Sequence, residues 1–374
     1  MDIETKIGLV RKKPTEEIVT EGDLREIFET HAHPKHYIGY EISGMVHIGS
    51  GLAVGLKIKD FLEAGIKPTV WLADYHAWIN GKLGGDIGKI QKIGEGYFKH
   101  ALISAGIDDE KVDYLLASKT YARHDEFWAD VLRIAKDTTM KRMLRCLTIM
   151  GRKESETLSA ASMIYPAMQA ADIFLLDVQI AHAGMDQRKA HMLAREVAGK
   201  FKKKFAAVHS HLLPGLQGVG RMNGPPTDET FQAALKGEQG KDDIVEMQTE
   251  AKMSKSKPDS AIFVHDSEEE IRRKISKAFC PEKIIEGNPI IEYAEHLILR
   301  DREMKVERPT KFGGDLAIAN SEELRRTYLE GKLHPMDLKN AVAGELIGML
   351  KPSRDYFAKH KEYLEQIKDI EITR

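Results

Sequence analysis

The fold class is decided by the run HYIGYEISGMVHIGSG, residues 36–51. Its first half, 36–43, is a short β-prone run, and apolar residues then recur with helical spacing at Leu52, Leu56, Ile58 and Phe61. Working outward, strands are predicted near 68–74, 112–116, 178–181 and 205–208, with helical stretches between them. Strands alternating with helices indicate an α/β fold, a Rossmann-type doubly wound parallel sheet. Its active site should lie beyond the carboxyl ends of the strands.

The chain changes character after residue 215. Glycine and proline interrupt any long periodicity up to about 250, apart from one short helix expected at 228–235. From Ser267 onward the pattern is helical, with one helix starting there and another at 335–350. We therefore expect a catalytic domain at 1–215 with an insertion at about 115–165, a linker at 216–260, and a C-terminal helical domain at 261–374.

Composition excludes several classes of protein. The chain has 374 residues and a net charge of −2, so any nucleic-acid contact must come from local basic runs such as 141–145 or 200–204. Each such run could equally be a solvated helix face. No stretch approaches the roughly 20 apolar residues of a membrane span, and residues 1–13 lack the apolar core of a secretory signal. With only Cys146 and Cys280, a disulfide framework is not expected, and a reducing cytoplasm is the natural compartment.

Two runs have the chemistry of a nucleotide site. The turn His47-Ile48-Gly49-Ser50-Gly51 follows the first strand and opens a helix, where free backbone N–H groups and the helix dipole are expected to favour an anion. Alone, it could be an ordinary strand–helix connection. Downstream, 252–257 reads KMSKSK, whose ammonium groups suit the charge that develops on departing pyrophosphate. Together the runs resemble the HIGH and KMSKS motifs of class I aminoacyl-tRNA synthetases, although Ser50 replaces the second histidine.

A buried polar stripe is predicted on the segment 165–173. In a helix, Tyr165, Gln169 and Asp172 fall at i, i+4 and i+7 on one face, and the rest of the segment is apolar. Pro166 either opens this helix or kinks it. Buried polar groups need partners, so the stripe is either an internal hydrogen-bond network or a ligand site. A second polar cluster, GMDQRK at 184–189, opens a helix after a strand and suits a pocket wall.

These features closely resemble the tyrosyl-tRNA synthetases of the archaeal and eukaryotic type. The resemblance runs from about residue 30 to 352 and implies that Tyr37 and Asp172 bind the substrate phenol. It also implies that Tyr165, Gln169 and Gln187 hold its ammonium and carboxylate end, with Glu41 and the wall 72–76 completing the pocket. The residues it implies for ATP binding are Gly39, His47, Gly49, Ser50, Lys252, Met253 and Lys255, with His47, Lys252 and Lys255 catalytic.

Two C-terminal runs, 311–315 and 334–339, have side chains suited to an unpaired base. Phe312 precedes Gly313-Gly314, which can make a tight turn, and His334 precedes a proline at a helix start. Asp337 could be no more than a first-turn carboxylate. By the resemblance, Phe312 and His334 stack on the first anticodon base, Asp337 pairs with it, and 261–374 is an anticodon-binding domain. Likewise the insertion binds the acceptor stem, partly through Arg145.

The resemblance implies an enzyme that activates L-tyrosine with ATP and transfers it to tRNA(Tyr). It further implies Mg²⁺ carried by ATP, no protein-held metal, and a cytoplasmic homodimer. One alternative is a tryptophanyl-tRNA synthetase, but paired acceptors at Tyr37 and Asp172 suit a phenol better than an indole. A non-catalytic RNA-binding relative would not need the complete KMSKS run. A small-molecule adenylyltransferase would not need the C-terminal Phe312 and His334.

Overall fold

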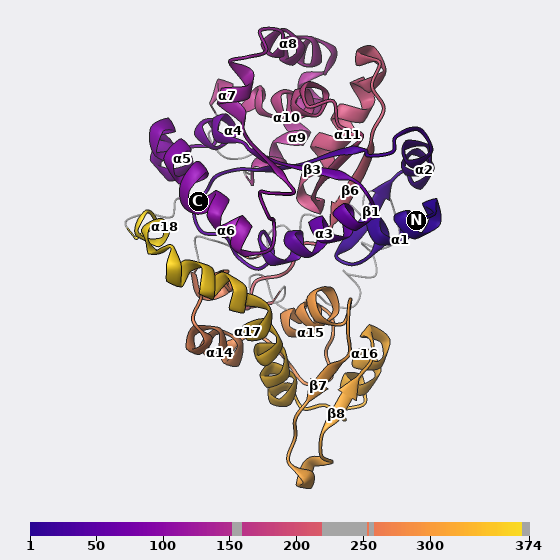
Figure 1. Ribbon diagram of the computed structural model, residues 1–374, viewed down its shortest axis with the longest axis vertical. Helices are drawn as coiled ribbons and strands as arrows, with labels where there is room; N and C mark the ends of the chain where they lie inside the picture. Colours follow the sequence, from indigo (N-terminus) through magenta and orange to yellow (C-terminus); the bar gives the residue numbers. More distant parts are fainter. Residues whose placement is uncertain (152–158, 219–252, 254–257, 369–374) are drawn as a thin grey trace.

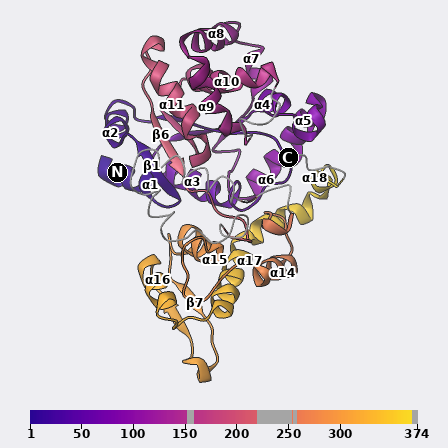
Figure 2. The same ribbon diagram turned by 180° about the vertical axis from the view of Figure 1, so that it is seen from behind.

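The computed structural model describes residues 1–151, 159–218, 253 and 258–368. Within them the chain forms a larger α/β body and a smaller C-terminal body, which lie one below the other in both views (Figures 1 and 2). The last described helix, α18 (Lys361–Glu365), lies beside the larger body, because the long helix α17 (Pro335–Lys359) runs back to it. The helix expected at 228–235 lies outside the described residues.

The larger body is built on a sheet that has six strands in the described part of the chain, ordered β1-β6-β5-β2-β3-β4. Neighbouring strands from β2 to β6 pair in parallel, with Tyr37 opposite Thr69 on one side and Ala181 on the other. This confirms the predicted doubly wound parallel sheet. The bounds of the parallel strands are β2 (Lys35–Tyr40), β3 (Lys67–Leu72), β4 (Asp113–Leu116), β5 (Ile180–Gly184) and β6 (Ala206–Ser210).

The edge strand β1 (Thr15–Val19) was not predicted, and it pairs antiparallel with β6. Its sequence, TEEIV, is mostly polar. Four of its side chains are partly buried, and one glutamate is exposed. An edge strand of this kind lacks the apolar run by which central parallel strands are recognised.

Side chains of the central strands alternate between two cores. Ile38, Val70 and Val208 face one core, to which buried residues of the C-terminal body also belong. Tyr37 and Trp71 face the other core. Helices cover both faces, as the period of two along each strand requires. They are α1 (Ile3–Arg11), α2 (Glu21–Thr30), α3 (Leu52–Glu63), α4 (Asp74–Ile79), α5 (Ile87–Ile93), α6 (Lys99–Ser104), α7 (Ala117–Tyr121), α8 (Phe127–Asp137), α9 (Met140–Cys146), α10 (Tyr165–Leu175) and α11 (Arg188–Val197).

The C-terminal body is mainly helical but also contains a two-stranded antiparallel sheet, β7 (Met304–Val306) with β8 (Leu316–Ile318). Strands of three residues leave too short a pattern to be recognised in a sequence. Helix α17 continues nine residues past the predicted end at 350, through Pro352, and Ser353 donates to the carbonyl of Ser104 at 2.9 Å. The other helices are α14 (Glu268–Lys277), α15 (Pro289–Tyr293), η8 (Ala294–Ile298), α16 (Ser321–Leu329) and α18 (Lys361–Glu365).

Among the described helices, none combines the length and the apolar character needed to cross a membrane.

Candidate active site

The predicted site residues lie where the order of the sheet reverses. From β2 the chain proceeds to β3 and β4 on one side, and then crosses to β5 and β6 on the other. Doubly wound sheets bind ligands in the crevice at such a switch point, beyond the carboxyl ends of the strands. The turn after β2 carries His47, α4 follows β3, and the short helix η5 (Met185–Gln187) follows β5. The three segments predicted to line the site therefore converge.

Helix α10 begins at Tyr165 with Pro166 in its first turn, so the proline opens the helix and does not kink it. A proline is tolerated there because the first N–H groups of a helix have no partner within the helix. All but two of the helix's residues are buried. The predicted polar stripe of Tyr165, Gln169 and Asp172 is thus set in an apolar helix that packs against α8 and α11.

Asp172 is held by two donors from different elements. Its carboxylate accepts from Trp71 Nε1 at 3.0 Å and from the Tyr121 hydroxyl at 2.6 Å. The side chain is almost fully buried, and this burial raises the pKa of Asp172 well above its usual range. The same two donors oppose the rise because they favour the charged form. The carboxylate is an oriented acceptor deep in the pocket.

Tyr37, on the central strand β2, lies close to Asp172. Burial first, and then the nearby charge of Asp172, raise the pKa of Tyr37 well above its usual range, so its hydroxyl keeps its proton at neutral pH. Two residues on, Gly39 is exposed on the same face of the strand. A Cβ at Gly39 would lie 3.5 Å from the Tyr37 ring and 3.9 Å from Trp71. Glycine leaves the backbone of β2 accessible to a ligand here.

The first turn of α10 meets the loop after β2 through Glu41. The Tyr165 hydroxyl donates to Glu41 at 3.4 Å, and Asn80 Nδ2 donates to the same carboxylate oxygen at 2.7 Å. Lys82 lies 3.6 Å from the other oxygen. This group forms a polar end of the pocket, with a charged carboxylate balanced by one lysine.

Gln169 and Gln187 come together, as the resemblance implied. Gln169 Nε2 donates to Gln187 Oε1 at 3.2 Å, and Gln187 Nε2 donates to the carbonyl of Ile149 at 3.0 Å. The second contact fixes the orientation of the Gln187 amide, so its oxygen faces α10. Two amides joined in this way can exchange their mutual bond for bonds to a ligand.

Within the predicted wall at 72–76, His76 and Asp74 have different roles. His76 faces the pocket: its ring packs edge-on against Tyr165 at 4.6 Å, and its Nε2 lies 3.8 Å from Asp172. Asp74 instead joins helices behind the wall, because its carboxylate accepts from Gln91 and from the backbone and hydroxyl of Ser118. These contacts fully engage Asp74, which therefore supports the wall.

The turn at 47–50 is closed by its own side chains. Backbone N–H groups of Gly49 and Ser50 donate to His47 Nδ1 at 3.1 and 3.3 Å. The expectation that these N–H groups are free was therefore wrong, since the imidazole covers them. Because Nδ1 accepts, the neutral ring carries its proton on Nε2, which is the donor needed for a phosphate oxygen. The Ser50 hydroxyl bonds back to the His47 backbone at 3.2 and 3.3 Å and so closes the turn.

Of the predicted KMSKS run, the structure describes only Met253. Its side chain is buried, and its N–H donates to the carbonyl of Leu213 at 3.3 Å. Leu213 also lies beside the histidine turn, 3.8 Å from the position of a Cβ on Gly49. The start of the run is thus anchored next to the turn. Lys252 and Lys255 lie outside the described residues.

The predicted RNA-contacting residues lie on two surfaces. Arg145 is exposed in the last turn of α9, on the insertion between β4 and α10. The other three lie in the C-terminal body. His334 caps α17, accepting from the Met336 N–H at 3.2 Å, and Asp337 lies in the first turn.

Arg308 brings the two C-terminal segments together. Gly313 and Gly314 have positive φ angles, as the predicted tight turn requires, and Phe312 directly precedes them. Arg308 donates to the carbonyl of Gly314 at 2.9 Å and to that of Lys332 at 2.8 Å. The turn is thereby tied to the segment that leads into His334.

Sequence reasoning missed Trp71, Tyr121, Asn80 and Arg308. Trp71 alternates with Leu72 on β3, so its place on the pocket face could have been read from the period of two. Tyr121 and Asn80 carry no comparable signal, because their contacts depend on how α7 and α4 pack.

The chain matches the family model described as tRNA synthetases class I (W and Y) over residues 29–224 and 234–351. A tyrosine–tRNA ligase of Thermococcus sibiricus is 50% identical over 390 residues, covering 100% of both chains. The crystal structure of a tyrosyl-tRNA synthetase from Pyrococcus horikoshii, complexed with L-tyrosine, matches with a TM-score of 0.91 at 48% identity, covering 99% of this chain and 100% of that one. A tyrosyl-tRNA synthetase from Aeropyrum pernix matches with a TM-score of 0.81 at 38% identity, covering 99% of both chains.

Sequence motifs, sheet topology and these full-length similarities agree. The chain belongs to the class I tRNA synthetases of the tryptophan and tyrosine family.

Proposed function

We propose that this chain activates L-tyrosine with ATP and transfers the tyrosyl group to tRNA(Tyr). The observation that carries the proposal is the buried Asp172 carboxylate, oriented by Trp71 and Tyr121 beside Tyr37. A pocket built around a buried acceptor binds a phenol and leaves the acceptor unsatisfied when the hydroxyl is missing. The full-length relatives support the same choice, since they are named tyrosine ligases.

The pocket has a polar group at each end for the amino-acid substrate. In the proposal Asp172 and Tyr37 bind the phenol, while Tyr165, Gln169 and Gln187 hold the ammonium and carboxylate end. Glu41, paired with Tyr165 and Asn80, adds negative charge near the ammonium. The support is that Tyr165, Gln169 and Asp172 share one face of α10, with Tyr165 bonded to Glu41 at one end and Asp172 bonded to Trp71 at the other.

The nucleotide binds at the histidine turn in this proposal. A tyrosine carboxylate oxygen attacks the α-phosphorus of ATP, the bond to the β-phosphate breaks, and pyrophosphate leaves with the Mg²⁺ that ATP carries. His47 donates through Nε2. Gly39, Gly49, Ser50 and Met253 line the nucleotide site, and Lys252 and Lys255 neutralise the departing charge. The terminal adenosine of the RNA then attacks the tyrosyl carbonyl, and AMP leaves.

The RNA is held at both bodies in this proposal. Arg145 contacts the acceptor stem. Phe312 and His334 stack on the first anticodon base, and Asp337 accepts from its edge. The support is the Arg308 contact that ties the segments carrying Phe312 and His334 together.

A homodimer in the cytoplasm completes the proposal. On α8, Trp128 and Leu132 are exposed one turn apart, and on α9 Met140 and Leu144 repeat the spacing. Exposed apolar patches of this kind mark protein interfaces. Sedimentation equilibrium of the purified protein gives the oligomeric state directly. The two cysteines, unpaired in the structure, fit a reducing compartment.

Amino-acid-dependent ATP–pyrophosphate exchange tests the function. We expect exchange with tyrosine and at most a trace with tryptophan or phenylalanine. Exchange that tryptophan supports as well as tyrosine would identify the tryptophan enzyme instead. A protein that binds tRNA without any exchange would be the non-catalytic relative.

A further inference from the structure

A group of metal-binding side chain types lies outside the active site, where the two bodies meet. His211 directly follows β6, Glu292 lies on α15, and His296 lies on η8. One ligand atom from each residue lies within 4.8 Å of the other two. Glu292 and His296 are four residues apart, and both contact His211 at the end of β6.

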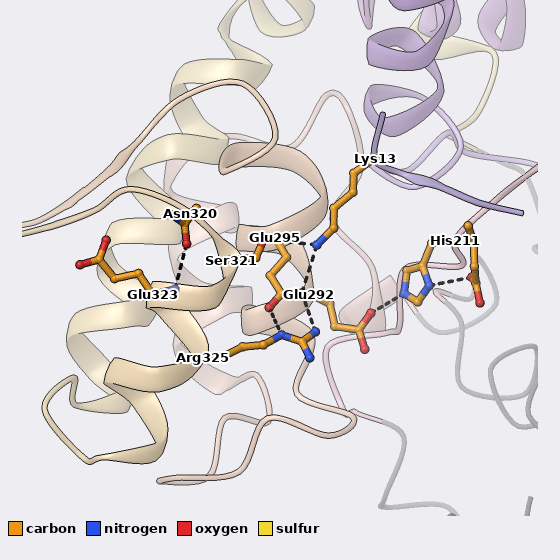
Figure 3. Close-up of polar contacts among 9 residues, drawn as sticks. Lys13, His211, Glu292, Glu295, Asn320, Ser321, Glu323 and Arg325 are labelled. Carbon is orange, nitrogen blue, oxygen red and sulfur yellow. Dashed lines mark hydrogen bonds and ion pairs between the residues drawn. The ribbon is translucent and has the colours of Figure 1, made fainter. Parts of the chain in front are cut away.

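The His211 ring is oriented by a carboxylate on each side. Its Nδ1 lies 3.0 Å from Glu16 Oε2. Its Nε2 contacts the Glu292 carboxylate (Figure 3). A carboxylate on one ring nitrogen fixes the tautomer and aims the other nitrogen, which is the arrangement found behind metal-bound histidines. Glu16 therefore prepares Nε2 to bind a cation beside the Glu292 oxygen.

His296 contributes a nitrogen that the rest of the described chain leaves unused. Its Nδ1 is buried and has no hydrogen-bond partner among the described residues. Burial and the positive charge of His211 lower the pKa of His296 to about 2, so the ring is neutral and has a lone pair. Buried polar atoms without a partner are rare and call for an explanation.

We propose that His211, Glu292 and His296 together bind a divalent transition metal ion, for which Zn²⁺ is the best match. Two imidazoles and one carboxylate are a ligand set typical of zinc, with water as a fourth ligand. This departs from the expectation of no protein-held metal, because the ligands come from distant segments that form no sequence motif. The bound ion joins the end of β6 to the C-terminal body.

Metal binding requires one of the two histidine rings to leave its present stack. His211 and His296 are stacked with centroids 4.2 Å apart and planes 6° from parallel. A tetrahedral ion bound at about 2.0–2.1 Å from each nitrogen lies in both ring planes, so one ring must tilt out of the stack.

A proton competes for the same position. Although burial lowers it, the hydrogen bonds to Glu16 and Glu292 raise the pKa of His211 to about 9. A metal ion must displace this proton to bind Nε2. Nearby, Lys13 and Arg325 add positive charge, but both are paired with Glu295 (Figure 3). The facing groups are therefore Glu16, Glu292 and Glu295 against Lys13, Arg325 and the two histidines.

The test is a zinc titration of the full-length protein, stripped with EDTA and competed against a chromophoric chelator. His296→Phe keeps a ring against His211 but removes the ligand nitrogen, and Glu292→Gln removes the charged ligand. His124→Gln, at an exposed histidine, is the matched control. We expect the wild type and His124→Gln each to bind one equivalent of zinc tightly. Glu16→Gln should lower the zinc affinity by about 10–100-fold. His296→Phe and Glu292→Gln should lower it by more.

One further measurement uses the wild type alone. Co²⁺ bound at the site should give the visible absorption of a tetrahedral ion. Wild-type protein that binds no equivalent of zinc tightly, or His296→Phe with wild-type zinc affinity, overturns the proposal. In either case the residues form a proton-bridged ion pair only.

Discussion

At the scale of single residues, the proposed function makes the choice of amino acid depend on the lone pairs that Asp172 keeps free for the substrate. The carboxylate accepts from Trp71 and Tyr121, which leaves lone pairs on both oxygens for a further donor. The phenol of a bound tyrosine is such a donor, and the phenylalanine ring is not. Since leaving a buried donor or acceptor without its partner costs about 1–3 kcal/mol, this one contact can account for a large part of the discrimination.

We expect Asp172→Ala to lower kcat/KM for tyrosine by an amount equivalent to about 2–5 kcal/mol, because the substrate hydroxyl and two protein donors lose a charged partner. Phenylalanine should be affected much less. Pyrophosphate exchange with each amino acid measures both. Equal losses for the two substrates would remove Asp172 from the phenol site.

Glu17 provides a pH-dependent contact at the edge of the sheet. Although burial raises it, hydrogen bonds from His209 and Arg188 lower the pKa of Glu17 to about 2. A lowered carboxyl pKa stabilises the folded state above the unfolded value of 4.5, and this contribution is lost as the pH falls towards 2.

Accordingly, Glu17→Gln should destabilise the protein at pH 6, and its difference from the wild type should shrink between pH 4.5 and 3. Urea unfolding of both proteins at pH 6 and at pH 3 measures the difference in their free energies of unfolding. Glu21→Gln, at an exposed carboxylate paired with Arg11, is the control and should change stability little. A difference for Glu17→Gln that is as large at pH 3 as at pH 6 would show that the loss does not come from the charge.

At the scale of elements, the position of α3 is set by how closely it approaches another backbone. A Cβ on Gly55 would lie 2.3 Å from the carbonyl oxygen of Ala105, at the end of α6. The backbone oxygen cannot move aside as a flexible side chain could. Because α3 starts directly after the histidine turn, this approach also fixes the turn against α6.

Gly55→Ala should therefore destabilise the protein. Overpacking costs about 1–3 kcal/mol, whereas the better helix propensity of alanine returns only about 0.5–1 kcal/mol. Gly8→Ala on α1, where nothing lies within 4 Å, should be neutral or stabilising. The thermal unfolding midpoints of the two variants, each compared with the wild type, measure these changes. Similar midpoints would show that α3 and α6 separate readily.

The elements that could be predicted are those whose pattern comes from burial. Strands β2 to β6 carry apolar runs, and helix starts such as Ser267 carry their own caps, so both follow from local chemistry. Strand β1 and the pair β7–β8 depend on a partner strand for their hydrogen bonds, which no local pattern records. The same holds in the pocket: the stripe on α10 was predictable, whereas Tyr121 depends on packing.

At the scale of the whole molecule, the two bodies are held together by buried polar contacts. Asp60 on α3 contacts Arg300 beyond η8, and Lys57 donates to Asp60 at 3.2 Å. Tyr293 on α15 donates to the carbonyl of Pro214 at 2.6 Å. Removing one member of a buried ion pair is costly, so these contacts keep the bodies in one arrangement. The segments predicted to read RNA are therefore held at a fixed separation from the pocket.

A whole-molecule prediction concerns the anticodon end. His334 has a structural role besides the proposed one, since it caps α17. His334→Asn keeps a capping side chain but removes the ring, so it isolates the loss of stacking. Stacking is worth about 1–3 kcal/mol per base and tolerates any base. We expect His334→Asn to raise the RNA KM to a similar degree for the native anticodon and for one changed at its first base.

Asp337→Ala should behave differently, because a carboxylate accepts only from donors on the base edge and so distinguishes bases. We expect Asp337→Ala to raise the RNA KM for the native anticodon. The difference in KM between the native RNA and the RNA changed at its first anticodon base should become smaller. Neither variant should alter pyrophosphate exchange, since that reaction needs no RNA and takes place in the other body. Aminoacylation of both transcripts, with exchange measured alongside, separates the two effects. An anticodon preference that survives Asp337→Ala would place base recognition elsewhere, even with the tyrosine pocket correctly assigned.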